Sequence, residues 1–175
     1  LSLVGSEMCI RDRYNSRREV FMTVIIFAIL AAGIFLLDLL IKNYIETHLE
    51  VGQEKSVCRG KLLIRRYHNR GAFLDAGEKR QKAVALLSLL LTLFMTVVFL
   101  STFSLRGNST LRAGLALLLG GAYSNTYDRL TRNYVVDYVS FPVKNKRVRR
   151  VVFNISDFCI MIGALLMVLG DMRRK

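Results

Sequence analysis

The chain has 175 residues and a formal net charge of +13, and 53% of its residues are hydrophobic. This length fits one domain. The apolar residues occur in blocks such as LLSLLLTLFMTVVFL that offer no polar face, which excludes a soluble helical bundle and indicates an integral membrane protein. Because the Lys and Arg residues cluster beside these blocks, we expect membrane lipids as partners and no nucleic acid.

The first 13 residues, LSLVGSEMCIRDR, differ from the rest of the chain. They lack the apolar core and the small-residue cleavage site of a secretory signal. They look like a translated adapter from a sequencing read. We therefore treat residues 1–13 as a non-native segment and residues 14–175 as a single four-span membrane domain.

Four apolar segments approach the ~20 residues that a membrane-spanning helix needs. They are Val20–Ile41, Ala83–Phe103, Leu111–Tyr127 and Phe153–Gly170. The third is the least uniform, because it is interrupted by Gly114, Gly120, Gly121 and Asn125. The sequence thus predicts an all-α membrane fold with four transmembrane helices.

The first span carries Asp38 near its far end and Lys42 four residues later. This spacing places both side chains on one helical face, where they can form an ion pair. Two interpretations remain open at this point. The pair either extends to the membrane interface at the helix end, or it is a buried polar support for a nearby site.

Residues 43–82 form the longest polar stretch. Within it, VCRGKLLIRRYHN is rich in branched and aromatic residues and contains Gly60, which predicts a small β-hairpin or sheet on the membrane surface. NRGAF follows at residues 69–73. Its Gly and Asn favour a turn, and the Asn69 amide can both donate and accept hydrogen bonds.

Asp128 ends the third apolar segment, and Asp157 lies near the start of the fourth. Because successive membrane helices run in opposite directions, these two ends lie on the same side of the membrane. A carboxylate near hydrocarbon is costly and usually functional. Two carboxylates ~3 Å apart share one proton, as in aspartic proteases. The sequence therefore predicts a catalytic pair of Asp128 and Asp157.

The segment between these aspartates includes VVDYVSF, which alternates loosely and predicts a strand or an interfacial helix. We expect its Asp137 to lie among solvated groups and to be structural. The cysteines and histidines show no metal-ligand spacing; they are Cys9, Cys58, Cys159, His48 and His68. We therefore predict no metal, no cofactor and no disulfide framework.

Four motifs, in this order, resemble the signature regions of the lipoprotein signal peptidases, also called signal peptidase II. They are the pair Asp38 and Lys42, NRGAF, GGAYSNTYDR at residues 120–129 and FNISD at residues 153–157. The resemblance covers essentially everything after residue 20. It implies a monomeric, multi-pass enzyme of the bacterial cytoplasmic membrane. It also implies a small extracytoplasmic β-subdomain after the first helix and an active site near that face.

The resemblance also implies roles for individual residues. Asp128 and Asp157 match the two catalytic aspartates of the family. The positions that bind the substrate or support the dyad are matched by Asn69, Asn125, Arg129 and Asn154, and the bracing pair by Asp38 and Lys42.

Three residues depart from the usual family pattern. Ser124 replaces a Gly, Ser156 replaces an Ala, and Leu39 replaces a Gln. The two added hydroxyls can form local hydrogen bonds beside the dyad. These departures concern substrate preference and optimum pH more than the type of reaction.

The activity implied by the resemblance is removal of the signal peptide from a prolipoprotein whose cysteine already carries diacylglycerol. Cleavage would fall on the amino side of that cysteine. The alternative is a small transporter or channel subunit that passes protons or cations along Asp38, Asp128 and Asp157. Such proteins usually place their acids near the membrane midplane, whereas these acids lie at span ends, which favours the peptidase.

The distribution of basic residues bears on the orientation in the membrane. The family orientation places both termini in the cytoplasm. The two outer loops would then hold 16 Lys and Arg residues, and the cytoplasmic side would hold 7. The positive-inside rule by itself predicts the reverse. We follow the resemblance, because folded loops can carry basic residues for their own reasons.

Overall fold

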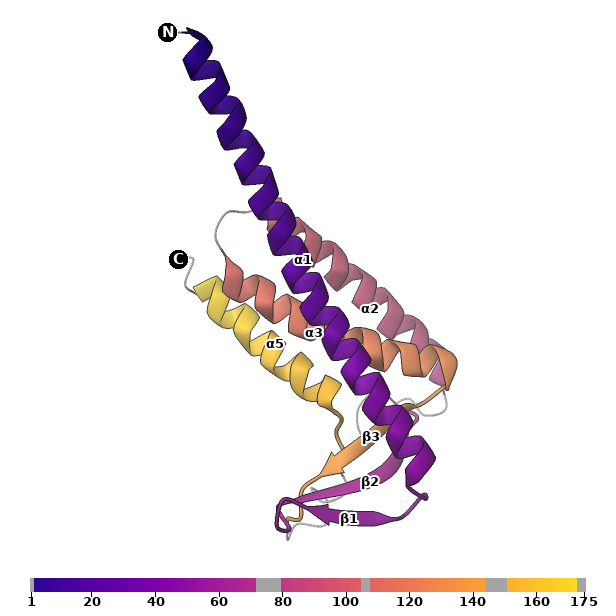
Figure 1. The fold of residues 1–175 in the computed structure, drawn as a ribbon. Helices are drawn as coiled ribbons and strands as arrows, with labels where there is room; N and C mark the ends of the chain where they lie inside the picture. The colour runs from indigo at the N-terminus through magenta and orange to yellow at the C-terminus, as the bar shows by residue number, and fades with distance from the viewer. Residues whose placement is uncertain (1, 72–79, 105–107, 144–150, 173–175) are drawn as a thin grey trace.

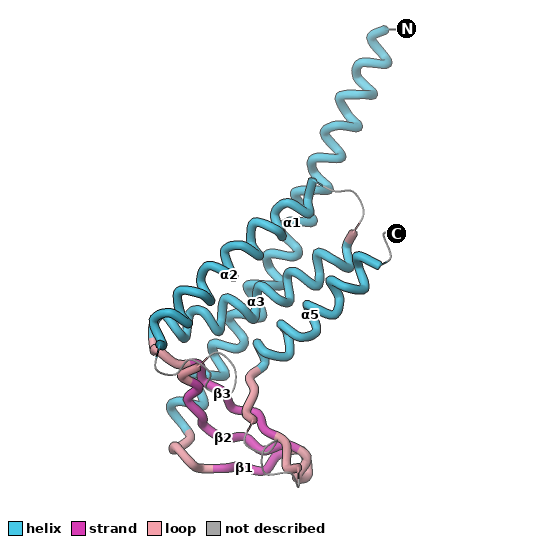
Figure 2. The backbone as a smooth tube through the Cα atoms, turned by 180° about the vertical axis from the view of Figure 1, so that it is seen from behind, coloured by secondary structure: helices cyan, strands magenta, loops and turns pink. Residues whose placement is uncertain are grey.

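The computed structural model describes residues 2–71, 80–104, 108–143 and 151–172, with side chains from residue 18 onward except that of residue 104 (Figure 1). Within these ranges the chain forms helices α1 (Ser2–His48), α2 (Gln81–Ser101), α3 (Ser109–Thr131) and α5 (Ile155–Met172). A short 3-10 helix, η2 (Thr102–Ser104), follows α2. The strands are β1 (Glu54–Val57), β2 (Leu62–Asn69) and β3 (Val135–Ser140). The small sheet lies at one end of the helix bundle (Figure 2).

Three helical segments in the described part of the chain are long and apolar enough to cross a membrane. They are Arg18–His48 within α1, and helices α2 and α5. The prediction of a largely helical membrane protein with a small sheet is therefore confirmed. Helix α3 differs, because it carries Arg112 and Asp128, which are buried. It packs against α1, α2 and α5, so these polar side chains lie among helices.

Helix α1 continues beyond the predicted end of the first span at Ile41 and reaches His48. Its last turns leave the helix bundle and pack against the sheet. Ile45 and Leu49 are buried in one apolar cluster with Val136 and Tyr138 of β3. This contact with β3, which comes far later in the sequence, explains why the helix extends into a polar stretch.

The three strands form an antiparallel sheet in the order β1-β2-β3. The predicted hairpin is confirmed, and its turn uses positive φ angles at Cys58, Arg59 and Gly60. The VVDYVSF segment forms the third strand, so the strand interpretation is confirmed. In the register of β2 and β3, Tyr67 lies opposite Asp137 and Asn69 lies opposite Val135.

Glycines allow α3 and α5 to pack with their backbones in contact. A Cβ at Gly114 would lie 2.7 Å from the carbonyl oxygen of Gly163, and one at Gly163 would lie 2.5 Å from that of Gly114. A Cβ at Gly121 would overlap the carbonyl oxygen of Ser156. Small residues at such crossings are typical of membrane helices. The Gly121 contact brings the end of α3 beside the start of α5.

We predict that Gly121→Ala destabilises the protein by about 1–3 kcal/mol, because the added methyl group must displace the α5 backbone. The matched control is Gly33→Ala in α1, where a Cβ would meet nothing within 4 Å. Thermal unfolding in detergent measures both effects. Equal melting temperatures for the two variants would show that this close approach does not constrain the bundle.

Candidate active site

Lys42 is the centre of a buried polar cluster where α1 and α3 meet. Its Nζ lies 2.8 Å from Asp38 Oδ2 and 3.1 Å from Asp128 Oδ2, and all three side chains are fully buried. Nζ also donates to Ser124 Oγ at 3.0 Å and to Asn125 Oδ1 at 2.8 Å. The Asp38–Lys42 pair is therefore buried, as the second interpretation expects. The interpretation of a pair at the membrane interface is wrong, because neither side chain reaches solvent.

Asp128 lies between two cations. One is Lys42, and the other is Arg132, whose Nε atom lies 3.4 Å from Asp128 Oδ1. The backbone N–H of Val136 donates to its Oδ2 at 3.3 Å. Asp128 thus joins the end of α3 to α1 and to β3.

Asp157 lies in the first turn of α5, where it forms a reciprocal cap with Asn154. The N–H of Asp157 donates to Asn154 Oδ1 at 2.9 Å, and the N–H of Asn154 donates to Asp157 Oδ2 at 3.1 Å. This arrangement satisfies two backbone donors at the helix start and fixes the carboxylate. Asn125 of α3 adds a third hydrogen bond, from its Nδ2 to Asp157 Oδ1, at 2.9 Å. The Asp157 side chain is half-buried.

Asp137 lies in β3 and is only 2% exposed. The expectation that it lies among solvated groups is therefore wrong. Asn154 Nδ2 donates to its Oδ1 at 2.6 Å, and Asn69 Nδ2 donates to its Oδ2 at 3.0 Å. Burial, followed by the neighbouring charge of Asp157, raises the pKa of Asp137 to about 7. Asp137 is therefore a candidate functional residue beside Asp157 that the sequence alone did not reveal.

One signal for Asp137 was present in the sequence. Asp137 is an acidic residue among apolar residues that favour a strand. Because successive side chains of a strand point to opposite faces of the sheet, Asp137 lies on one face and its two sequence neighbours lie on the other. The observed strand places it on the face shared with Asn69 and the start of α5, while Val136 and Tyr138 enter the apolar cluster. The alternation of polar and apolar residues in VVDYVSF did not indicate that α5 would cover this face of the sheet.

Arg129 and the NRG segment complete the surroundings of the carboxylates. The guanidinium of Arg129 donates to the carbonyl oxygens of Asn125 at 3.2 Å and Gly71 at 3.4 Å. It lies within electrostatic range of Asp128, Asp137 and Asp157. The N–H of Gly71 donates to Asn69 Oδ1 at 3.1 Å, as expected for a turn. The rest of the NRGAF motif, Ala72 and Phe73, lies outside the described residues.

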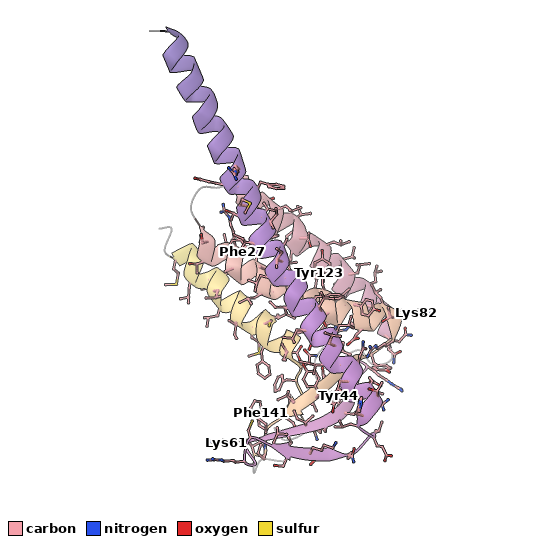
Figure 3. The ribbon with its side chains drawn as sticks, in the orientation of Figure 1. Phe27, Tyr44, Lys61, Lys82, Tyr123 and Phe141 are labelled. Carbon is pink, nitrogen blue, oxygen red and sulfur yellow. The ribbon has the colours of Figure 1, made fainter. Side chains whose placement is uncertain are left out.

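The structure brings the sequence-predicted site residues together at the sheet end of the bundle. Tyr44 and Lys82, which are labelled in Figure 3, mark this end on α1 and α2. Asn125 connects the two groups of carboxylates, because its Oδ1 accepts from Lys42 and its Nδ2 donates to Asp157. Asn154 connects Asp157 to Asp137. Direct proton sharing between Asp128 and Asp157 stays a prediction.

The site as described is built from carboxylates, amides and cations. Among the residues with described positions, no group of three or more His, Cys, Asp or Glu side chains is arranged to hold a metal ion. Buried carboxylates beside amide donors can exchange protons with a bound water molecule or a polar substrate group. The arrangement can therefore perform acid–base chemistry.

The chain resembles solved structures and curated proteins over most of its length. One solved structure, described as a bacterial membrane enzyme, superimposes on this chain with a TM-score of 0.71 and a sequence identity of 21%. The superposition covers 84% of this chain and 87% of the chain in that structure. This likeness shows the fold. Three curated relatives, from Lactiplantibacillus plantarum, Mesorhizobium japonicum and Pseudomonas aeruginosa, are each called lipoprotein signal peptidase.

These relatives are 28%, 30% and 29% identical to this chain, respectively. The alignments cover 85%, 83% and 94% of this chain and 95%, 84% and 93% of the relatives. A family model described as signal peptidase (SPase) II matches residues 30–173. With this match over most of its length, the chain belongs to the signal peptidase II family.

Proposed function

We propose that this protein is a membrane aspartic endopeptidase that removes signal peptides from bacterial prolipoproteins. It cleaves on the amino side of a cysteine that carries diacylglycerol. Membership of the signal peptidase II family supports the peptidase activity and the prolipoprotein substrate. The observation that carries the aspartic mechanism is the pair Asp137 and Asp157, which share hydrogen bonds with Asn154 beside the ends of membrane helices.

The choice of Asp137 replaces the pair Asp128 and Asp157 that the sequence predicts. Asp128 is fully buried between Lys42 and Arg132, so a shared proton there would disrupt two ion pairs. Asp137 accepts its hydrogen bonds from neutral amides, and its pKa of about 7 allows it to hold a proton near neutral pH. We therefore assign the chemistry to Asp137 and Asp157, and a bracing role to Asp128.

In this mechanism the two carboxylates share one proton and titrate as a unit. The ionised member, Asp157, takes a proton from a water molecule whose oxygen attacks the scissile carbonyl carbon. Asp137 donates its proton to the developing oxyanion. As the tetrahedral intermediate collapses and the C–N bond breaks, Asp157 gives its proton to the leaving amine and Asp137 takes back a proton from a hydroxyl of the intermediate, which restores the pair. Asn69, Asn125 and Asn154 hold the two carboxylates in place.

Arg129 has a separate role in this proposal. Its guanidinium contacts the carbonyl oxygen of Gly71 and lies within range of both Asp137 and Asp157. It can stabilise the negative charge of the pair and present donors to a substrate carbonyl. A position at the helix ends also suits the substrate, because its acyl chains can remain in the bilayer while the peptide enters the site.

The proposal includes a four-span topology in the bacterial inner membrane and a monomeric enzyme. Helix α3 is the fourth span, since its 23 residues extend roughly 34 Å, enough for the ~30 Å hydrocarbon core. Both termini face the cytoplasm, and the sheet and the active site lie at the opposite face. The excess of basic residues in the sheet-side loops binds anionic lipid headgroups.

We predict that Asp137→Asn and Asp157→Asn each lower kcat/KM by at least about 1000-fold in a folded protein, because neither carboxylate can replace the other. Asp128→Asn should instead mainly lower stability, since breaking a buried ion pair costs about 3–5 kcal/mol. The assay is cleavage of a diacylglyceryl-modified prolipoprotein by purified protein in lipid, with thermal unfolding as the control. If the Asp137→Asn protein were active and the Asp128→Asn protein were folded but inactive, the catalytic pair would be Asp128 and Asp157, as predicted from the sequence.

The raised pKa of Asp137 predicts two pH effects. Cleavage should decline as the pH rises through about 7, because the pair loses its shared proton. The folded state also holds this proton more tightly than the unfolded chain, so its contribution to stability is present at low pH and lost through about 7. The melting temperature of the wild type should therefore fall, relative to Asp137→Asn, between pH 5 and 8. Parallel curves would contradict this assignment.

The orientation predicts which cysteines react in intact cells. One variant keeps only Cys58, which is exposed in the hairpin turn. A second variant lacks the native cysteines and carries Ser109→Cys, at the end of α3 that lies away from the sheet. An impermeant thiol reagent should label the first variant and spare the second until the cells are opened. The reverse pattern would show that the charge distribution, and not the family resemblance, sets the topology.

A further inference from the structure

The hydroxyl of Tyr138 joins two elements of the site. Tyr138 follows Asp137 in β3 and is 3% exposed. Its hydroxyl donates to Asp38 Oδ1 at 2.8 Å and accepts the backbone N–H of Ile155 at 3.1 Å. Ile155 is the first residue of α5, and Asp157 lies two residues later. The hydrogen bond to Asp38 is buried, where such a bond is strongest, and the one from Ile155 is partly buried.

Asp38 is a firmly held acceptor for this hydroxyl. Its other oxygen, Oδ2, accepts from Ser124 at 2.6 Å, from Ser156 at 2.5 Å and from Lys42 at 2.8 Å. Oδ1 therefore remains for Tyr138. Burial and then the charge of Asp38 raise the pKa of Tyr138, so its hydroxyl stays protonated and keeps the donor role.

The hydrogen bonds of the Tyr138 hydroxyl add to a backbone contact between β3 and the segment that precedes α5. Val139 and Phe153 form an antiparallel bridge, with N–H to O distances of 2.7 Å in both directions. That bridge ends before α5. The N–H of Ile155 belongs to the first turn of α5, where backbone donors have no partner within the helix. Tyr138 satisfies this donor, and it thereby attaches the helix itself to the strand that carries Asp137.

We infer that Tyr138 is a positioning residue of the peptidase reaction, whose hydroxyl fixes β3 against the first turn of α5 and so sets the separation of Asp137 and Asp157. This inference rests on the proposed function. The other charged groups that face Asp137 are Lys42 of α1 and Arg129 of α3. Neither is bonded to the Tyr138 hydroxyl, whose two partners are Asp38 and Ile155.

The test compares Tyr138→Phe with Tyr134→Phe. Both changes remove only a phenol oxygen, and the control retains the ring stacking of residue 134 on His68, with centroids 4.0 Å apart. Loss of a hydrogen bond to a charged group should lower kcat about 10-fold or more, with little change in KM. The high-pH limb of kcat should move to lower pH in Tyr138→Phe, because Asp137 then relaxes away from the charge of Asp157.

The possible results separate this inference from the proposed function. An unchanged kcat, an unmoved pH limb or an unfolded Tyr138→Phe protein would overturn the positioning role, while an active wild type and an inactive Asp137→Asn protein would leave the proposed function standing. A wild type that fails to cleave the lipid-modified substrate, or an active Asp137→Asn protein, would overturn the proposed function and the inference with it. A reduced kcat with a shifted limb, and a normal Tyr134→Phe control, would support both.

Discussion

The sheet end of this molecule depends on one constraint, which is that charged side chains buried away from water must be paired with opposite charges. Two cations, Lys42 and Arg132, face two carboxylates, Asp38 and Asp128, at the junction of α1, α3 and β3. Lys42, Asp38 and Asp128 are fully buried, so removal of Lys42 would leave two carboxylates uncompensated where water cannot solvate them, which costs several kcal/mol. Each element is therefore held in one position relative to the others, and the second group of carboxylates can be placed beside this cluster.

That second group is held by a different kind of partner. Asp137 and Asp157 accept hydrogen bonds from the amides of Asn69, Asn125 and Asn154. Neutral donors fix the position of a carboxylate without fixing its charge as firmly as a paired ammonium does. In the proposed mechanism this difference separates bracing from chemistry, because a carboxylate held by neutral amides gives up and takes back a shared proton more readily than one held in a direct ion pair.

Much of this arrangement could be predicted from local sequence. The spacing of Asp38 and Lys42 indicated an ion pair, Gly60 indicated the hairpin turn, and the antiparallel order of spans placed Asp157 beside the end of α3. The environment of Asp137 could not be predicted in this way. Its burial depends on Asn69, which is 68 residues away in the sequence, and on the cover that α5 provides. A local pattern of alternating residues carries no information about such partners.

In the proposed mechanism, Asp137 and Asp157 flank the reacting carbonyl while Asp128 stays in its ion pairs. The most direct test is a structure of the enzyme bound to a lipopeptide in which a hydroxyl-bearing tetrahedral carbon replaces the scissile carbonyl. We expect the hydroxyl to lie within hydrogen-bonding distance of both Asp137 and Asp157, with Asp128 still paired to Lys42. A hydroxyl bound between Asp128 and Asp157, with the Lys42 pair broken, would contradict it.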